Sequence, residues 1–197
     1  IQTDIAVFQN TSINQIIGRP ISTASGFSNI IENGGEVRTR GLEASVQALM
    51  FERGAFSWSL EANFTTYRSV VTELPEGVDQ YVTGEASVFR GAGGSNSVFY
   101  IARKNGRIGD MYGSGFQEFE GQTIFGSNGL PIQDGRLRLL GNYNPDFFVG
   151  LTNQFRYKKL QLGFVFDWRQ GGTIVSRTKA LGSTSGVLKE TLEGRET

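Results

Sequence analysis

Polar and apolar residues alternate along residues 147–157 and again along 160–169. In "FFVGLTNQFRY" the odd positions are mostly apolar, and the even positions include Gly, Thr, Gln and Arg; in "LQLGFVFDWR" five apolar residues recur at every second position. A strand sends alternate side chains to opposite faces, whereas a helical period of 3.6 residues would scatter them around a cylinder. The two runs meet at Lys158 and Lys159, so the pattern predicts an antiparallel hairpin with a tight turn there.

A second pair of runs, at 41–50 and 56–65, has the same design and is joined by "FERGA". One face of this pair carries the apolar residues Leu42, Ala44, Val46, Ala48, Met50, Phe56, Trp58, Leu60, Ala62 and Phe64. The pattern predicts a hairpin with its turn at 51–55. We expect both hairpins to belong to one curved antiparallel sheet, with their tight turns at the same end.

The length of these runs bears on where such a sheet would lie. Each run has about ten residues, which suits a tilted strand that crosses a bilayer and is long for a soluble strand. Aromatic residues stand near the ends of the runs, where a membrane interface favours them, at Phe56, Trp58, Tyr157 and Trp168. The pattern therefore predicts an all-β, antiparallel transmembrane β-barrel segment. The same alternation is also compatible with a soluble sandwich whose apolar faces meet in a closed core.

The remaining chain is divided by segments rich in turn-forming residues. Residues 17–36, 73–98 and 171–197 are predicted as long loops. Residues 99–125 are expected to supply two further strands, and 1–17 one more. Long loops at one end of a sheet and tight turns at the other are typical of outer-membrane barrels and uncommon in compact soluble domains.

Composition narrows the function classes. The chain has 27 glycines, a formal net charge of +0, 38% hydrophobic residues and a mean hydropathy of -0.23. No apolar stretch approaches the roughly 18 residues of a membrane helix, which excludes a helical membrane protein, and the composition gives no sign of a nucleic-acid-binding surface. Cysteine and histidine are both absent, which removes disulfides, thiolate or histidine metal sites and a Ser-His-Asp triad. We therefore expect neither an enzyme nor a bound cofactor.

Several blocks of the sequence resemble one known family when they are taken in order. They are "ENGGEVRTRGLEASVQ", "FSWSLEANFTTYRSVVTEL", "GRIGDMYGSGFQEFEGQTIFGSNGLPI", "LGNYNPDFFVGLTNQFRYKKLQLGFVFDWRQGGTIVSRT" and "GRET". Together they resemble the later barrel region of the SusC/RagA family of TonB-dependent outer-membrane transporters. The resemblance implies a plugged 22-stranded barrel in the outer membrane of a Gram-negative, Bacteroidetes-like cell. It also implies import of oligosaccharides or peptides, a SusD-like surface lipoprotein as partner, and energy coupling through TonB.

The extent of the chain departs from that family. A 22-stranded barrel needs several hundred residues, whereas this chain offers about six to eight strands by its pattern. No signal peptide, plug or closing strands are recognised in the sequence. We therefore expect residues 1–197 to be part of one receptor barrel domain, with outer-membrane lipid against its apolar face.

The candidate functional residues lie on the polar faces of the four clearest runs. We expect these side chains to face the lumen of the barrel, where they contact water, a plug or solute: Glu43, Gln47, Glu61, Asn63, Gln154, Arg156, Asp167 and Arg169. Glu118 and Glu120 are expected to share one strand face, and "GAGGSN" at 91–96 is expected to be an external loop rather than a phosphate-binding loop. The alternative function is an adhesin or carbohydrate-binding β-sandwich, soluble or attached to the cell surface.

Overall fold

The computed structural model describes residues 1–27, 29–87 and 97–192 of the chain. These residues form 11 strands, one α-helix and short 3-10 turns, so the predicted all-β class is confirmed. Strands are more numerous than the six to eight expected, partly because two of them have only two residues each. The chain divides into two compact units, residues 1–79 with 103–108 and 144–172, and residues 80–102 with 109–143 and 173–197.

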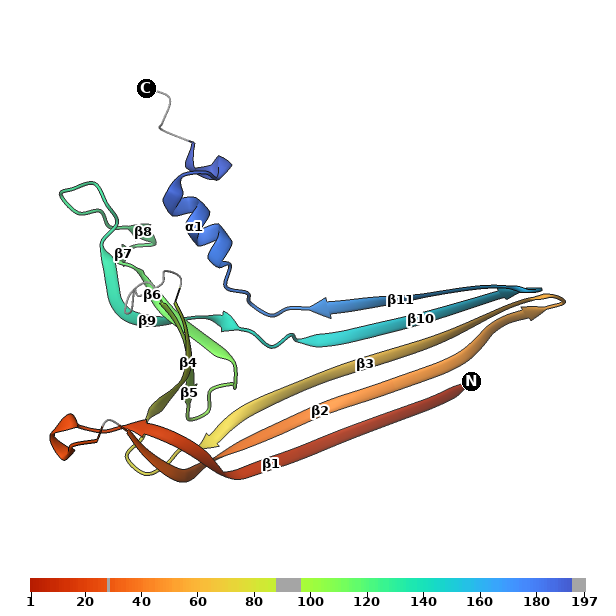
Figure 1. The fold of residues 1–197 in the computed structure, drawn as a ribbon, viewed down its shortest axis with the longest axis horizontal. Coiled ribbons are helices and arrows are strands. Elements are labelled where there is room, and N and C mark those ends of the chain that lie inside the picture. The colour runs from red at the N-terminus through yellow and green to blue at the C-terminus, as the bar shows by residue number, and fades with distance from the viewer. Residues whose placement is uncertain (28, 88–96, 193–197) are drawn as a thin grey trace. The chain divides into compact units, whose positions relative to one another are not determined.

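The first unit is a five-stranded antiparallel sheet (Figure 1). Its strand order is β1-β2-β3-β10-β11. The strands are β1 (Gln2–Pro20), β2 (Asn29–Arg53), β3 (Phe56–Glu73), β10 (Phe147–Tyr157) and β11 (Leu160–Gln170). β3 and β10 are therefore direct neighbours although the whole of 74–146 separates them in sequence.

Both predicted hairpins are present, and their tight turns lie at the same end of the sheet. The turn residues are 54–55 and 158–159. Tyr157 is paired with Phe56, which places the last residue of β10 beside the first residue of β3. The backbone N–H of Lys158 donates a 3.0 Å hydrogen bond to the carbonyl of Ala55, so the two turns are joined directly. The predicted arrangement of the turns is confirmed.

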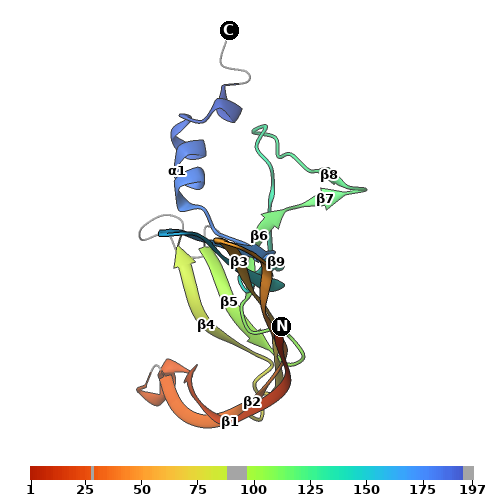
Figure 2. The same ribbon diagram turned by 90° about the vertical axis from the view of Figure 1, so that its right-hand side faces the viewer.

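The prediction of a loop over 17–36 is wrong for most of its length. β1 continues to Pro20 and β2 begins at Asn29, so the two strands pair beyond the region covered by β3. Asn14 and Gly35 have positive φ angles of 55° and 81°, and the two-stranded ribbon curves in this region (Figure 2). Ile17 is 5% exposed and lies against Gly35. Burial of this isoleucine explains why a sequence rich in turn formers is nevertheless extended.

A β-bulge changes the end of β2. The pairing with β3 shifts between Leu49 and Phe51, so Met50 is the extra residue and Phe51 lies opposite Trp58. The expected place of Met50 on the apolar face is therefore taken by Phe51. The strand also runs to Arg53, which shortens the predicted turn at 51–55 to two residues.

The second unit contains a four-stranded sheet of order β4-β5-β6-β9. Its strands are β4 (Gln80–Ser87), β5 (Ser97–Arg103), β6 (Asp110–Phe116) and β9 (Gln133–Asn142), and a small hairpin is formed by β7 (Glu118–Phe119) and β8 (Gln122–Thr123). The two strands expected within 99–125 correspond to β5 and β6. The prediction of a loop over 73–98 is wrong for the residues that form β4 and the start of β5. The strand β9 was not predicted. "GAGGSN" lies outside the described residues.

The core of this unit is small and apolar. It contains Val98, Ile101, Ala102, Met111 and Tyr112, each at most 8% exposed. Burial of such side chains stabilises a fold by about 1.5 to 3 kcal/mol each for the larger ones. This core holds β5 and β6 together, where the alternation of polar and apolar residues is weak.

The loop predicted over 171–197 contains α1 (Arg177–Ser185) and a 3-10 turn (Lys189–Thr191). The Ser176 hydroxyl caps the helix by accepting a hydrogen bond from the backbone N–H of Lys179. Gly186 ends it in the left-handed conformation, with φ 69°. Within the described residues, no helix is long and apolar enough to cross a membrane.

Candidate functional site

One face of the five-stranded sheet is apolar across all its strands. Register places the following residues on it: Ile5, Val7, Leu42, Ala44, Val46, Ala48, Phe51, Phe56, Trp58, Leu60, Ala62, Phe64, Val149, Leu151, Phe155, Leu160, Leu162, Phe164, Phe166 and Trp168. Many of them are exposed; Leu162, for example, is 64% exposed and Phe164 50%. A continuous exposed surface of this kind requires an apolar environment.

Aromatic rings gather at both ends of this apolar face. At the end with the tight turns, Phe155 stacks on Trp58 with ring centroids 5.5 Å apart and lies 6.4 Å from the ring of Phe56. At the other end, Phe147 contacts Phe64 at 5.8 Å and Trp168 at 5.3 Å. The expected positions of aromatic residues near strand ends are therefore confirmed.

The spacing of the two aromatic groups can be compared with a membrane. β10 has 11 residues, which extend over about 33 Å at about 3.3 Å per residue. A tilt of about 40° reduces this length to about 25 Å, which is the height of the apolar band of outer-membrane barrels. The apolar face thus has both the height and the chemistry of a surface that contacts lipid.

An amide side chain, that of Asn153, lies on the apolar face near its middle. Asn153 lies opposite Leu60 and Phe164. Its side-chain carbonyl accepts a 3.2 Å hydrogen bond from the indole Nε1–H of Trp58. An unpaired amide in an apolar medium costs about 1 to 3 kcal/mol, so Trp58 makes this asparagine tolerable on that face.

The opposite face is polar, and it carries all eight residues singled out from the sequence. Four successive pairings form one row across the five strands, made of Asp4, Ser45, Asn63, Gly150 and Asp167. The adjacent row on one side contains Glu43, Thr65, Phe148 and Arg169, and the row on the other side contains Gln47, Glu61 and Thr152. Gln154 and Arg156 lie further toward the tight turns. The structure therefore brings these residues together on one surface.

A hollow lies on this polar face beside Gly150, between β3 and β11. Gly150 has no side chain, and Asn63 and Asp167 flank it on the two neighbouring strands. The hollow has a volume of about 400 Å³ and is bordered also by Phe148 and Arg169. The Arg169 guanidinium lies 5.1 Å from the centroid of the Phe148 ring, a cation-π contact. Phe148 and Gly150 were not singled out from the sequence, because an aromatic residue and a glycine on a polar face give no local signal.

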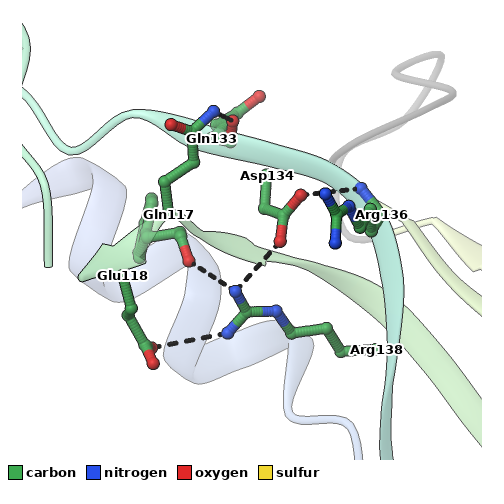
Figure 3. Close-up of polar contacts among 7 residues, drawn as sticks. Gln117, Glu118, Gln133, Asp134, Arg136 and Arg138 are labelled. Carbon is green, nitrogen blue, oxygen red and sulfur yellow. Dashed lines mark hydrogen bonds and ion pairs between the residues drawn. The ribbon is translucent and has the colours of Figure 1, made fainter. Parts of the chain in front are cut away.

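The second unit holds a network of charges around Arg138 (Figure 3). Its guanidinium lies 2.9 Å from the Asp134 carboxylate and 3.4 Å from that of Glu118. A hydrogen bond from the backbone N–H of Arg136, followed by the bond from Arg138, holds the pKa of the Asp134 carboxyl below its ordinary value. Glu120 lies in the turn after β7 with a φ of 50°, so the expected shared strand face for Glu118 and Glu120 is wrong.

The polar face of the sheet offers groups that donate and accept hydrogen bonds. Among residues 1–27, 29–87 and 97–192, no group of three or more acidic side chains is placed to hold a metal ion. The Asp167 carboxylate, the Asn63 amide and the Arg169 guanidinium beside the hollow can exchange hydrogen bonds with a hydrated or polar solute.

Comparison with known proteins identifies the class to which this arrangement corresponds. No family model matches the chain. TonB-dependent receptor P3 of Formosa agariphila is 26% identical over 180 residues, which are 81% of this chain and 18% of that protein. TonB-dependent receptor P39 of the same organism is 27% identical over 128 residues, which are 64% of this chain and 11% of that protein. The chain thus spans less than a fifth of the length of the curated relatives it matches.

Solved structures share the fold. One chain of the RagAB peptide transporter superposes with a TM-score of 0.60 and 16% identity, over 84% of this chain and 18% of that one. The RagAB peptide importer in its open-open state gives a TM-score of 0.54 and 14% identity, over 85% of this chain and 18% of that one. The resemblance to the SusC/RagA family of TonB-dependent receptors is therefore confirmed, and the proteins found are receptors and transporters.

Proposed function

We propose that residues 1–197 are part of the barrel wall and extracellular loops of a SusC-like TonB-dependent transporter in the outer membrane. The observation that carries this proposal is the five-stranded sheet with one continuous apolar face and one polar face. In a closed barrel the apolar face contacts lipid and the polar face lines the lumen. The tight turns at 54–55 and 158–159 then belong to the periplasmic end.

In this proposal the eight polar-face residues line the path of the solute. Glu43, Glu61 and Asp167 supply acceptors, Arg156 and Arg169 supply donors, and the amides of the remaining members, Gln47, Asn63 and Gln154, supply both. Such a surface stays hydrated and exchanges hydrogen bonds with an oligosaccharide or a peptide. No chemical change of the solute is needed, so the function is transport rather than catalysis.

The partners follow from the same proposal. A plug in another part of the protein fills the lumen, and TonB coupling rearranges it when solute is admitted. A SusD-like surface lipoprotein covers the extracellular end, and the cell is Gram-negative and Bacteroidetes-like. The similarity to TonB-dependent receptors and to the RagAB fold supports these assignments.

The alternative of a soluble β-sandwich requires the apolar face to be buried in a core. In the sheet it is exposed, with Phe166 54% and Trp168 48% exposed. Burying one such aromatic side chain is worth about 1.5 to 3 kcal/mol, so a soluble domain would not leave a whole face uncovered. The exposed face therefore favours the transporter over an adhesin or carbohydrate-binding module.

The test uses the full-length protein in a cell from which its gene has been deleted. Complementation should return the protein to the outer-membrane fraction and restore uptake of labelled oligosaccharides or peptides, and removal of TonB should abolish that uptake. Recovery of the protein from the soluble fraction as a monodisperse species without detergent would contradict the proposal. Uptake that is independent of TonB would contradict its mechanism.

A further inference from the structure

The second unit contains a pocket that is lined only by residues of that unit. Its volume is about 360 Å³. Met111, 1% exposed, borders it from the core, and the segment before α1 contributes Thr173 and Ile174. The backbone N–H of Thr173 donates a 2.8 Å hydrogen bond to the carbonyl of Asn142, which fixes this segment against the end of β9.

Two tyrosines form one side of the pocket. Tyr100 of β5 and Tyr143, just after β9, contact each other edge to face with ring centroids 5.7 Å apart. Neither hydroxyl makes a hydrogen bond to another residue in the part of the chain that the structure describes. Tyr143 is 48% exposed, and because neither hydroxyl is used within the protein, both are available to a ligand.

The pocket has one charged side chain, Arg177. It is the first residue of α1, and its guanidinium makes no ion pair within residues 1–27, 29–87 and 97–192. The N-terminal end of a helix carries a partial positive charge, which adds to that of the guanidinium. Both charges favour an anionic group at this end of the pocket.

The lining distinguishes two classes of solute. It contains aliphatic and aromatic side chains, hydroxyls and a guanidinium, but neither a carboxylate nor an amide side chain. A neutral sugar presents many hydroxyl donors, and the side-chain acceptors of this lining are hydroxyls only, with none of the stronger carboxylate acceptors. A carboxylate beside an apolar side chain satisfies the guanidinium and the hydroxyls and fills the apolar part.

We propose that this pocket binds the C-terminal residue of a peptide, with the carboxylate at Arg177 and an apolar side chain among Met111, Ile174 and the two tyrosines. The proposal rests on the proposed transport function, for which it selects peptides over oligosaccharides. Tyr143 then donates its hydroxyl to the same carboxylate.

The experiment measures binding to the full-length protein in detergent by titration calorimetry. The probes are acetyl-Gly-Gly-Leu, its C-terminal amide, and glucuronate, which carries a carboxylate without an apolar side chain. A hydrogen bond between two charged groups is about twice as strong as one between neutral groups, so the free acid should bind at least about tenfold more tightly than the amide. Arg177→Gln should remove this difference, whereas the matched variant Lys179→Gln, in the same helix but outside the pocket, should keep it.

Three results would overturn the inference. They are equal affinity for acid and amide, an unchanged preference in Arg177→Gln, and binding of glucuronate as tight as that of the peptide acid. The proposed function is judged separately by TonB-dependent uptake in cells. If uptake is intact and the acid preference is missing, only the pocket assignment fails; if binding is as expected and TonB-dependent uptake is missing, the transport proposal fails.

Discussion

Phe164→Lys tests which face of the sheet contacts lipid. Phe164 and Val165 are adjacent residues at the middle of β11, on opposite faces. Phe164 stacks on Phe155 at 6.0 Å, and Val165 is paired with Thr152 on the polar face. The two positions therefore form a matched pair in one strand, at one depth.

The expected cost can be estimated from the structure. A lysine at the bilayer midplane on the lipid face destabilises a barrel by about 2 to 4 kcal/mol. Loss of the aromatic contact adds about 0.5 to 1.5 kcal/mol. Phe164→Lys should therefore lower the free energy of unfolding by about 3 to 5 kcal/mol, whereas Val165→Lys should be mild because its ammonium meets water and Asp167.

The assay is denaturant unfolding of the full-length protein in lipid vesicles, with both variants compared with wild type. A soluble sandwich would also be damaged at Phe164, so spin labels at 164 and 165 supply the decisive measurement. Lipid-soluble oxygen should relax the label at 164 more strongly, and a water-soluble nickel chelate the label at 165. The reverse order, or no difference between the positions, would refute the assignment of the faces.

Three further changes test particular contacts. Trp58→Phe removes the donor to Asn153 and should destabilise the barrel by about 1 to 3 kcal/mol in the same unfolding assay, and the double variant with Asn153→Leu should recover most of that loss; a fully additive result would contradict the pairing. Gly41→Val should destabilise the barrel by about 1 to 3 kcal/mol because its Cβ would overlap the Phe8 ring and lie 2.8 Å from the Thr66 carbonyl oxygen. Gly163→Ala is the control that we expect to be tolerated, since no atom lies nearer than 3.7 Å to the added Cβ. Equal stability of the two variants would count against this packing. The pKa of Asp134 is lowered in the fold, so the stability from its bonds to Arg136 and Arg138 is fully present above the ordinary value of 3.8 and is lost as the pH falls through the lowered pKa. Exchange of the Arg136 backbone amide should therefore accelerate only below pH 3.8. Asp134→Asn should abolish this dependence on pH.

The alternation of side chains was sufficient to predict the hairpins and their faces. Successive strand residues point in opposite directions, so the polarity of 147–157 and 160–169 determined which side chains share a surface. The eight polar-face residues were found in this way, and the structure places all of them on one face. Their role in the lumen stays a prediction.

Pairing between distant strands was decided only by the tertiary structure. Nothing local in β3 or β10 specifies that the two are neighbours, because backbone hydrogen bonds between strands are the same for any sequence. The hollow at Gly150 depends on this pairing, since Asn63 belongs to β3 and Asp167 to β11. The hollow beside Gly150 therefore could not be predicted from the sequence.

Burial likewise decided the segments that the sequence assigned to loops. The β1–β2 ribbon continues through Ile17 and Gly35 because the isoleucine side chain is buried against the glycine. The pocket beside Arg177 forms because the segment at Thr173 is hydrogen-bonded to the end of β9. Turn-forming residues permit a loop without requiring one. The sequence by itself determined which side of each clear strand is polar. Contacts between distant residues determined which strands pair and where the pockets lie. Those contacts leave no periodic pattern in the chain, so they could not be predicted from it.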